Sequence, residues 1–236
     1  MHRVTKIRSA LRKYRSKEKA RVLQRFFKTG PGEYGEGDVF LGVVVPDIRT
    51  VAKQHRDIPL SDVVTLLKSP IHEERLTALL IFILQYQQGA ERTKKKIYTL
   101  YLRNTAYINN WDLVDLTAEH IVGAFLEHKE KKVLRRLATS RSLWERRIAI
   151  IATFHFIKEH TFKETLTIAR MLLRDEHDLI HKAVGWMLRE MGKRDRACEE
   201  RFLQKYYKCM PRTMLRYAIE RFPERKRGAY LKGKVK

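Results

Sequence analysis

Acidic residues are scarce in this sequence of 236 residues, which has 27 Asp and Glu against 50 Lys and Arg. The resulting formal net charge of +23 predicts a polyanionic partner, with nucleic acid first and an anionic membrane surface second. Long apolar runs are also missing. No stretch approaches the roughly 18 residues of a membrane span, and the N-terminus lacks the apolar region of a signal peptide. We therefore expect a cytoplasmic protein with no membrane contact.

Cysteine is equally rare, since the chain has only Cys198 and Cys209. Their spacing matches neither a metal knuckle nor a redox pair, so we expect two free thiols. Among nine histidines, His177 and His181 stand four residues apart on one predicted helix face. The sequence lacks the Glu of an HExxH motif there and a third ligand nearby, which favours surface histidines over a metal site. We expect neither a metal nor an organic cofactor.

Strand signals are nearly absent, whereas apolar residues recur at the three-to-four spacing of helices, as in Ile71, Ala78, Leu79 and Phe82. The run VVV at 43–45 ends at Pro46 and is better interpreted as an extended lead into a helix. We expect about a dozen helices from this pattern.

A weak internal echo relates HEERLTAL at 72–79 to WERRIAII at 144–151, an offset of 72 residues or two repeats of about 36. Helix starts near 108 and 179 fall close to the same period, which is that of helical-pair repeats of the HEAT or TPR kind. We therefore predict an all-α superhelical solenoid of about six helical pairs. Such a stack has a long concave face, which we expect to be a basic groove suited to a duplex.

Residues 26–49 carry five of the eleven glycines but match no phosphate-binding loop. We expect an ordered glycine-rich connection that packs near the first helices. At the other end, residues 223–236 read as a frayed basic tail that adds non-specific phosphate affinity. The predicted organisation is a single repeat domain over 1–222, followed by this tail, in a monomer.

The stretch NNWDLVDL at 109–116 places two carboxylates and an indole at a helix start. Asn110 is a good N-cap, and Asp112 in the first turn complements the helix dipole, so the structural interpretation of Asp112 wins. Asp115 lies beyond the first turn and shares a face with Trp111 four residues earlier. The pair is either a partly buried Trp with a solvated or Arg-paired Asp, or a functional patch.

Two later segments also carry candidate residues. In SLWERRIAI, Arg146 is followed by Arg147, which shares a face with apolar residues and must reach a carboxylate of the neighbouring repeat or a phosphate. In HKAVGWMLRE, Trp186 lies off the apolar stripe, on a charged face with Lys182, Arg189 and Glu190 as helical neighbours. A Trp among cations is typical of a binding surface. These four cations are our candidates for DNA binding.

These segments together resemble the AlkD-like DNA alkylation repair family, bacterial DNA glycosylases built from HEAT-like helical pairs. The resemblance rests on RFFKTGPGEYGEGDVFLGVVVPDIR, NNWDLVD, SLWERRIAI and KAVGWMLRE, which occur in family order between roughly residues 20 and 220. By motif position, the family's site of one aspartate and two tryptophans falls on Asp115, Trp111 and Trp186. The family's functional arginine falls on Arg147.

The resemblance implies a monofunctional DNA glycosylase of base excision repair, acting without cofactor on double-stranded DNA at the nucleoid. Its substrates would be cationic alkylpurines such as 3-methyladenine and 7-methylguanine. Breaking their glycosidic bond shifts positive charge onto the deoxyribose, and Asp115 and the two indoles would face that charge.

Two other functions compete with this one. A non-catalytic solenoid that binds nucleic acid explains the net charge but leaves the pair of Trp111 and Asp115 unexplained. A protein-interaction scaffold would call for exposed apolar anchors and a more balanced charge. Strong salt dependence of DNA binding separates the first two hypotheses from the third, and release of a methylated base separates the first from the second.

Overall fold

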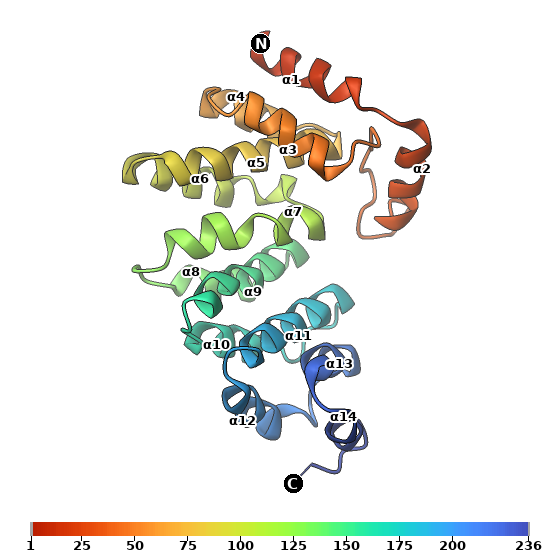
Figure 1. The fold of residues 1–236 in the computed structure, drawn as a ribbon, viewed down its shortest axis with the longest axis vertical. Helices are drawn as coiled ribbons and strands as arrows, with labels where there is room; N and C mark the ends of the chain where they lie inside the picture. The colour runs from red at the N-terminus through yellow and green to blue at the C-terminus, as the bar shows by residue number, and fades with distance from the viewer. Residues whose placement is uncertain (1, 236) are drawn as a thin grey trace. The chain divides into compact units, whose positions relative to one another are not determined.

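The computed structural model describes residues 2–235, which form fourteen α-helices and, over that range, no β-strand (Figure 1). One isolated parallel bridge joins Val39 to Ile71. The predicted all-α helical-repeat fold is confirmed. The chain divides into two compact units, the first ending at Thr117 and the second beginning at Ala118. None of the helices within 2–235 has both the length and the apolar character needed to cross a membrane.

The first unit contains seven α-helices and one short 3-10 turn: α1 (His2–Lys13), α2 (Lys17–Phe26), α3 (Val45–Gln54), α4 (Leu60–Leu67), α5 (His72–Gln88), α6 (Glu91–Arg103), η1 (Thr105–Tyr107) and α7 (Trp111–Asp115). Helix α5 is its centre, because α1, α3, α4, α6 and α7 all pack on it. Its residues are buried continuously from His72 to Ile83, as expected of a helix surrounded on all sides.

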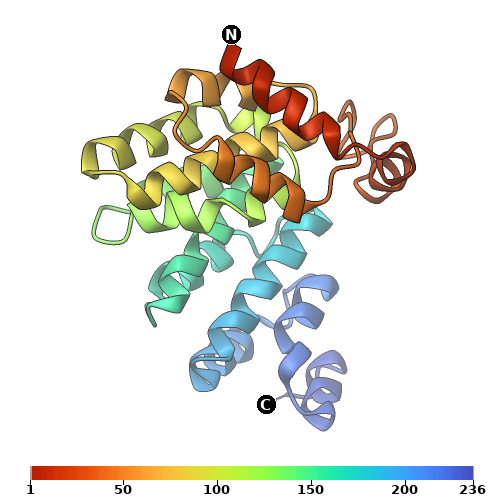
Figure 2. The same cartoon turned by 45° about the horizontal axis from the view of Figure 1, so that its top comes forward.

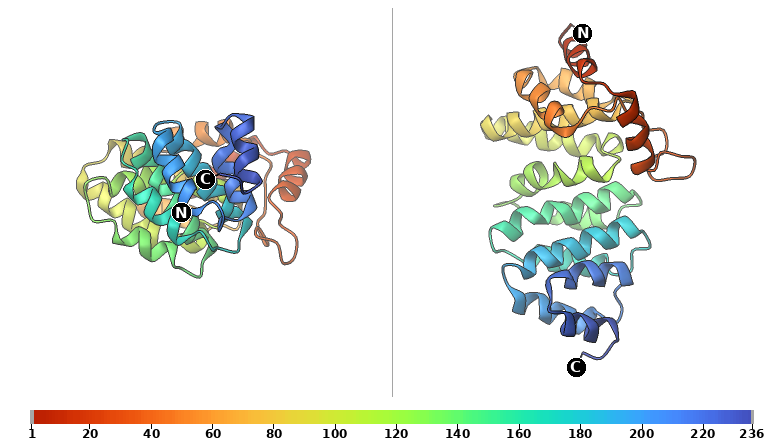
Figure 3. Two further views of the ribbon diagram at one scale, coloured as in Figure 1. Left: turned by 90° about the horizontal axis from the view of Figure 1, so that it is seen from below. Right: turned by 45° about the vertical axis from the view of Figure 1, so that its right-hand side comes forward.

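Helix α2 is the exception in this unit. It lies at the margin of the unit in every view (Figure 1, Figure 2 and Figure 3), and all ten of its residues are at least partly exposed. Its apolar side chains include Val22 and Phe26, each 61% exposed. The glycine-rich connection then runs from Phe27 to Val44 and leads into α3.

The second unit holds the remaining elements: η2 (Glu119–Gly123, a π-helical turn), α8 (Lys132–Ala138), α9 (Leu143–Lys158), α10 (Lys163–Met171), α11 (Asp178–Gly192), α12 (Arg196–Tyr206), α13 (Arg212–Ala218), η3 (Ile219–Arg221) and α14 (Glu224–Leu231). Helices α9 and α11 form its core: η2, α8, α10 and α11 pack on α9, and α12 and α13 pack on α11. Glycine permits a close approach of α11 to α13, since a Cβ at Gly185 would overlap the Met214 carbonyl of α13.

Several local predictions are confirmed. Pro46 stands in the first turn of α3, and α7 and α11 begin at Trp111 and Asp178, near the predicted positions. The glycine-rich connection is ordered and packs on the first helices, because a Cβ at Gly42 would fall 2.6 Å from the Ala20 nitrogen of α2.

The internal echo is one residue shorter in the structure than in the sequence alignment. The residues that precede α5 and α9 are Ile71 and Ser142, an offset of 71. Arg75 donates through Nη1 to the carbonyls of Ser69 and Pro70, and Arg146 donates in the same way to Ser140 and Arg141. The structural counterpart of Arg75 is therefore Arg146, whereas the sequence offset of 72 matches Arg75 with Arg147.

The expectation of a frayed tail is wrong for most of residues 223–236. Glu224–Leu231 form α14, and the Tyr230 ring is buried in edge contacts with Tyr207 and Phe222, at centroid distances of 5.3 and 5.6 Å. The sequence did not predict this helix, because its composition is basic and Tyr230 is its one buried residue.

Candidate functional site

Helix α7 carries Trp111 and Asp115, the two candidate residues of the first unit. Asn110 begins the helix as predicted, since its Oδ1 accepts from the Trp111 backbone nitrogen at 2.8 Å. The Asn110 side chain is fully buried, and its Nδ2 donates to Asp38 at 3.2 Å. Trp111 and Asp115 are both half-buried and lie one helical turn apart. Because α7 is helical over Trp111–Asp115, the two side chains lie on the same helix face.

An aromatic cluster holds the Trp111 ring. Phe27 stacks on it at a centroid distance of 5.0 Å, and Phe26 meets it edge-on at 5.8 Å. The Trp111 Nε1 donates to the Tyr34 hydroxyl at 3.1 Å. Phe27 stacks in turn on Phe40, 5.2 Å away on an almost parallel plane. The end of α2 and the glycine-rich connection thus fix the orientation of the indole.

A buried network of charged side chains also holds α7 in place. The His72 Nε2 lies 2.8 Å from Asp112 and its Nδ1 lies 3.0 Å from Asp38, while Arg75 Nη2 donates to Asp38 at 2.6 Å. The Phe40 ring stacks on the imidazole at 4.5 Å. We call these four residues, Asp38, His72, Arg75 and Asp112, the His72 clamp. It joins the glycine-rich connection, α5 and α7.

The clamp shifts the pKa values of two of its members, His72 and Asp38. Burial alone would lower the pKa of His72, but the charge of Asp112 and the hydrogen bonds to Asp112 and Asp38 outweigh burial and raise that pKa to about 9. Burial likewise favours the neutral form of Asp38, but the His72 bond and Arg75 lower its pKa overall. At neutral pH, the clamp is an imidazolium held between two carboxylates.

Asp115 lies at the end of α7, close to a buried tyrosine of α6. The Tyr101 hydroxyl is 2.9 Å from the Thr117 Oγ1, and Tyr101 is fully buried. Burial raises the Tyr101 pKa, and the negative charge of Asp115 raises it further. Thr117 donates to the Leu113 carbonyl of α7 at 2.5 Å. The turn that follows Asp115 is therefore held by bonds within the first unit.

Trp186 belongs to the second unit, on α11. It is half-buried, its Nε1 donates to Glu190 Oε1 at 3.3 Å, and its ring lies 5.9 Å from that of Phe154. Glu190 also pairs with Lys193 at 2.6 Å and with Arg194 at 3.8 Å. The prediction placed Trp186 among charged side chains, and Glu190 is the member of that group to which the indole binds.

The four candidate DNA-binding cations differ in their surroundings. Arg147 is only 5% exposed and donates to the Leu179 carbonyl of α11. Arg146 pairs with Asp175 at 2.6 Å and binds the two carbonyls described above. Lys182 pairs with Asp178 at 2.7 Å, and Arg189 pairs with Glu220 and Glu190. All four thus have partners within the second unit.

The histidines and cysteines give no metal site within residues 2–235, where no group of three or more His, Cys, Asp or Glu side chains could hold an ion. His177 and His181 are half-buried residues that also have hydrogen-bond partners within the second unit. His177 Nδ1 accepts from the Leu179 nitrogen at 3.1 Å and caps α11, and the His181 ring contacts the Asp175 carbonyl. Cys198 and Cys209 are free thiols, as predicted.

Sequence reasoning missed the clamp and the aromatic cluster. The available signal was HEER at 72–75, four polar residues at the start of an otherwise apolar helix. It indicated that these side chains needed buried partners, although their identity could not be read from it. The structural role inferred for Asp112 holds and extends beyond the helix dipole, because its carboxylate bonds His72.

Comparison with known proteins agrees with the sequence resemblance. A search of curated proteins finds no significant match. Among solved structures, the fold is similar to that of a predicted DNA alkylation repair enzyme from Enterococcus faecalis, with a TM-score of 0.68 and 15% identity over 89% of this chain and 97% of that one. At such low identity, the likeness supports the fold. The sequence model of the family described as DNA alkylation repair enzyme matches residues 7–222. The chain therefore belongs to the DNA alkylation repair enzyme family.

Proposed function

We propose that this protein is a monofunctional DNA glycosylase that hydrolyses the N-glycosidic bond of cationic alkylpurines in duplex DNA. Family membership supports a role in DNA alkylation repair. The observation that carries the finer proposal is the construction of α7: Trp111 and Asp115 share one face, and both the His72 clamp and the aromatic cluster hold that helix in place.

Asp115 is the proposed catalytic residue. As the bond to a 3-methyladenine or 7-methylguanine breaks, positive charge develops on the deoxyribose, and the carboxylate stabilises that charge. A pair of unit charges about 4 Å apart, at an effective dielectric constant near 20, interacts by about 4 kcal/mol. If this interaction energy acts only in the transition state, it increases the rate roughly a thousandfold. Asp115 can also orient the attacking water.

Trp111 is proposed to stabilise the same cation through its indole face. The aromatic cluster supports this role, because Phe27 and Tyr34 hold the indole in one orientation. Substrate binding then does not have to order the ring. By the family resemblance, we assign Trp186 the same task, with Glu190 fixing its indole nitrogen.

The DNA duplex itself is proposed to bind through cations, in keeping with the +23 charge of the chain. Of the four candidates, Lys182 has 40% of its side chain exposed and pairs with Asp178 at the surface, which a phosphate can displace. Arg146, Arg147 and Arg189 have buried or partly buried side chains with partners inside the unit. For these three, we propose a contribution through the fold of α9 and α11 in addition to any phosphate contact.

The proposal is tested by incubating the protein with duplex DNA that carries one 7-methylguanine, followed by chromatography of the released base. Time-dependent release of free 7-methylguanine, with an abasic site left in the strand, is the expected result. Tight, salt-sensitive binding without any released base would instead support a non-catalytic nucleic-acid-binding protein of the same family.

A further inference from the structure

Helix α2 spans a cavity and contacts the rest of the first unit mainly toward its two ends. Its N-terminal end is fixed, because the Ser16 nitrogen donates to the Leu41 carbonyl at 3.0 Å and Gly42 touches the same turn. Its C-terminal end is fixed as well, because Phe27, only 6% exposed, is stacked between Phe40 and Trp111. With both ends held, the middle of the helix forms an arch over the cavity.

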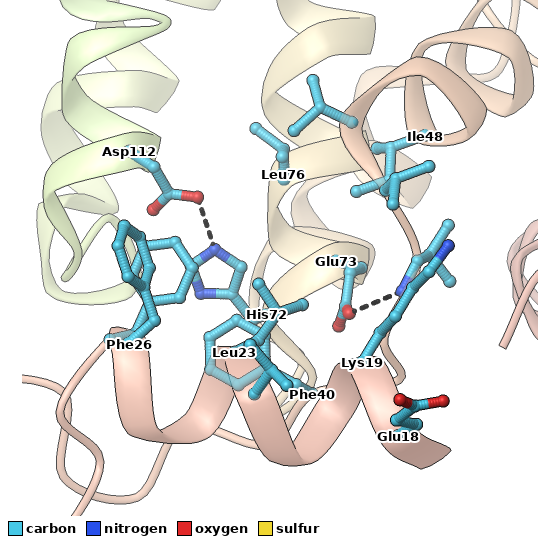
Figure 4. Close-up of a pocket in the computed structure, with 15 residues that line it drawn as sticks. Glu18, Lys19, Leu23, Phe26, Phe40, Ile48, His72, Glu73, Leu76 and Asp112 are labelled. Carbon is cyan, nitrogen blue, oxygen red and sulfur yellow. Dashed lines mark hydrogen bonds and ion pairs between the residues drawn. The ribbon is translucent and has the colours of Figure 1, made fainter. Parts of the chain in front are cut away.

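The cavity under this arch has a volume of about 450 Å³ and is lined mainly by apolar side chains from α2, the glycine-rich connection, α3 and α5. The apolar lining residues are Val22, Leu23, Phe26, Phe27, Phe40, Val43, Val44, Val45, Ile48 and Leu76. Figure 4 shows α2 along one side, with Glu18 and Lys19 near one end and Phe26 near the other. We call this space the α2 cavity.

Polar groups meet the α2 cavity at a few defined points. His72 and Asp112 line it beside Phe26, and Asp112 has 12% of its side chain exposed (Figure 4). Glu73 lines it too, and its carboxylate accepts from the backbone nitrogens of Leu41, Gly42 and Val43 at 2.8 to 3.1 Å. The cavity therefore offers apolar and aromatic walls and the partly exposed Asp112 carboxylate as an acceptor, since the Glu73 oxygens are already bonded to backbone nitrogens.

The α2 cavity adjoins the candidate site through its aromatic wall. Phe26 and Phe27 both line the cavity, and both contact the Trp111 ring. Asp112, which lines it as well, is the residue next to Trp111 in α7. The cavity and the Trp111 ring therefore share Phe26 and Phe27 as a common wall.

We propose that the α2 cavity binds the methylated purine base that the reaction releases, an inference that rests on the proposed function. A free 3-methyladenine is neutral, flat and aromatic, with amino hydrogens to donate. A flat ring packs against Phe26, which is 61% exposed, and its amino group donates to the Asp112 carboxylate. The volume lies within the range of ordinary ligand pockets, about 300 to 1,000 Å³, and leaves room for an alkyl substituent.

The inference is tested by titrating the full chain with free 3-methyladenine in a calorimeter and comparing two matched substitutions. Val45→Trp fills the cavity from a position that is 37% exposed, and Val39→Trp adds the same ring at a position 47% exposed that does not line the cavity. We expect saturable binding to the wild type, a loss of affinity of at least about tenfold in Val45→Trp, and less than about twofold in Val39→Trp.

Thermal unfolding shows whether each variant folds, and Val22→Trp on α2, at a position 61% exposed, fills the cavity from the other wall. Absence of binding to the wild type, or equal affinities in Val45→Trp and Val39→Trp, would overturn the inference. So would binding of an apolar naphthalene dye when 3-methyladenine does not bind.

Failure of the proposed function looks different. The calorimetric titration needs no catalysis, so a protein that binds 3-methyladenine yet releases no base from alkylated duplex contradicts the glycosylase proposal and leaves the cavity assigned to purine binding. A protein that releases base but does not bind it afterwards contradicts the cavity assignment alone.

Discussion

The Nε2 of His72 lies 2.8 Å from the Oδ2 of Asp112, and this bond ties the central helix of the first unit to the short helix that carries Trp111 and Asp115. Helix α7 has only five residues, too few to be stable through its own backbone bonds. Its orientation therefore depends on anchors, and the His72 clamp is the anchor with a titratable centre.

His72→Gln should remove a pH-dependent part of the folding free energy. The folded pKa of about 9 lies above the ordinary value of 6.5, so the stabilisation is complete below pH 6.5 and is lost as the pH rises through 9. Its full size is about 3 kcal/mol, because each tenfold change in proton affinity is worth about 1.4 kcal/mol. Urea unfolding at pH 6.5 and 9.5 measures the difference between wild type and variant.

That difference should be large at pH 6.5 and small at pH 9.5. Other groups that titrate in this range, such as Glu199 with a pKa raised to about 8 mainly by burial, are present in both proteins and cancel in the comparison. An equal difference at the two pH values would show that the clamp holds His72 in its neutral form.

Asp115→Asn should abolish most of the base release without loss of DNA affinity or stability, because the carboxylate is proposed to act on charge that appears in the transition state. We expect the single-turnover rate on a 7-methylguanine duplex to fall by roughly a hundredfold to a thousandfold.

Asp112→Asn is the matched control on the same helix. It removes the negative charge that faces the His72 imidazolium and should lower the unfolding temperature, whereas Asp115→Asn should not. Unfolding of the Asp115→Asn variant would make Asp115 a structural residue.

Local features of α7 were readable from the sequence because they depend on short spacing. Residues close in the chain determine an N-cap, a separation of one helical turn and a proline at a helix start. The structure shows all three: Asn110 caps α7, Trp111 and Asp115 lie one turn apart, and Pro46 stands in the first turn of α3. The helical repeat was also readable, from two similar segments 72 residues apart in the sequence, although its register was wrong by one residue.

The clamp and the α2 cavity could not be predicted in this way. His72 meets Asp38 and Asp112, which are 34 and 40 residues away, and nothing local specifies which buried acid pairs with which base. The pattern of α2 is amphipathic, so the sequence favours its burial on a core. Only the fixed positions of Ser16 and Phe27 show that the helix bridges a space instead.

Gly185→Ala should destabilise the second unit next to Trp186. A Cβ there would overlap the Met214 carbonyl and fall 2.5 Å from the Cβ of Tyr217, so α11 and α13 would have to move apart. We expect a loss of about 1 to 3 kcal/mol in urea unfolding. Gly228→Ala in α14 is the control, because a Cβ at that position has no described atom within 4 Å and alanine favours a helix. Equal stability in the two variants would contradict the close packing of α11 on α13.

The enzyme should discriminate lesions by charge more than by shape. None of the proposed residues supplies a general acid that could protonate a departing base, because the two indoles are not acids and the carboxylate of Asp115 is proposed to act on positive charge. A cationic 3-methyladenine or 7-methylguanine leaves as a neutral base, whereas uracil or an uncharged oxidised purine would have to leave as an anion without assistance. Stabilising the sugar cation is enough for the first group only.

A panel of duplexes with one lesion each, assayed in single turnover, measures this preference. Efficient excision of uracil with the 7-methylguanine duplex left intact would refute both the selectivity and the mechanism from which it follows.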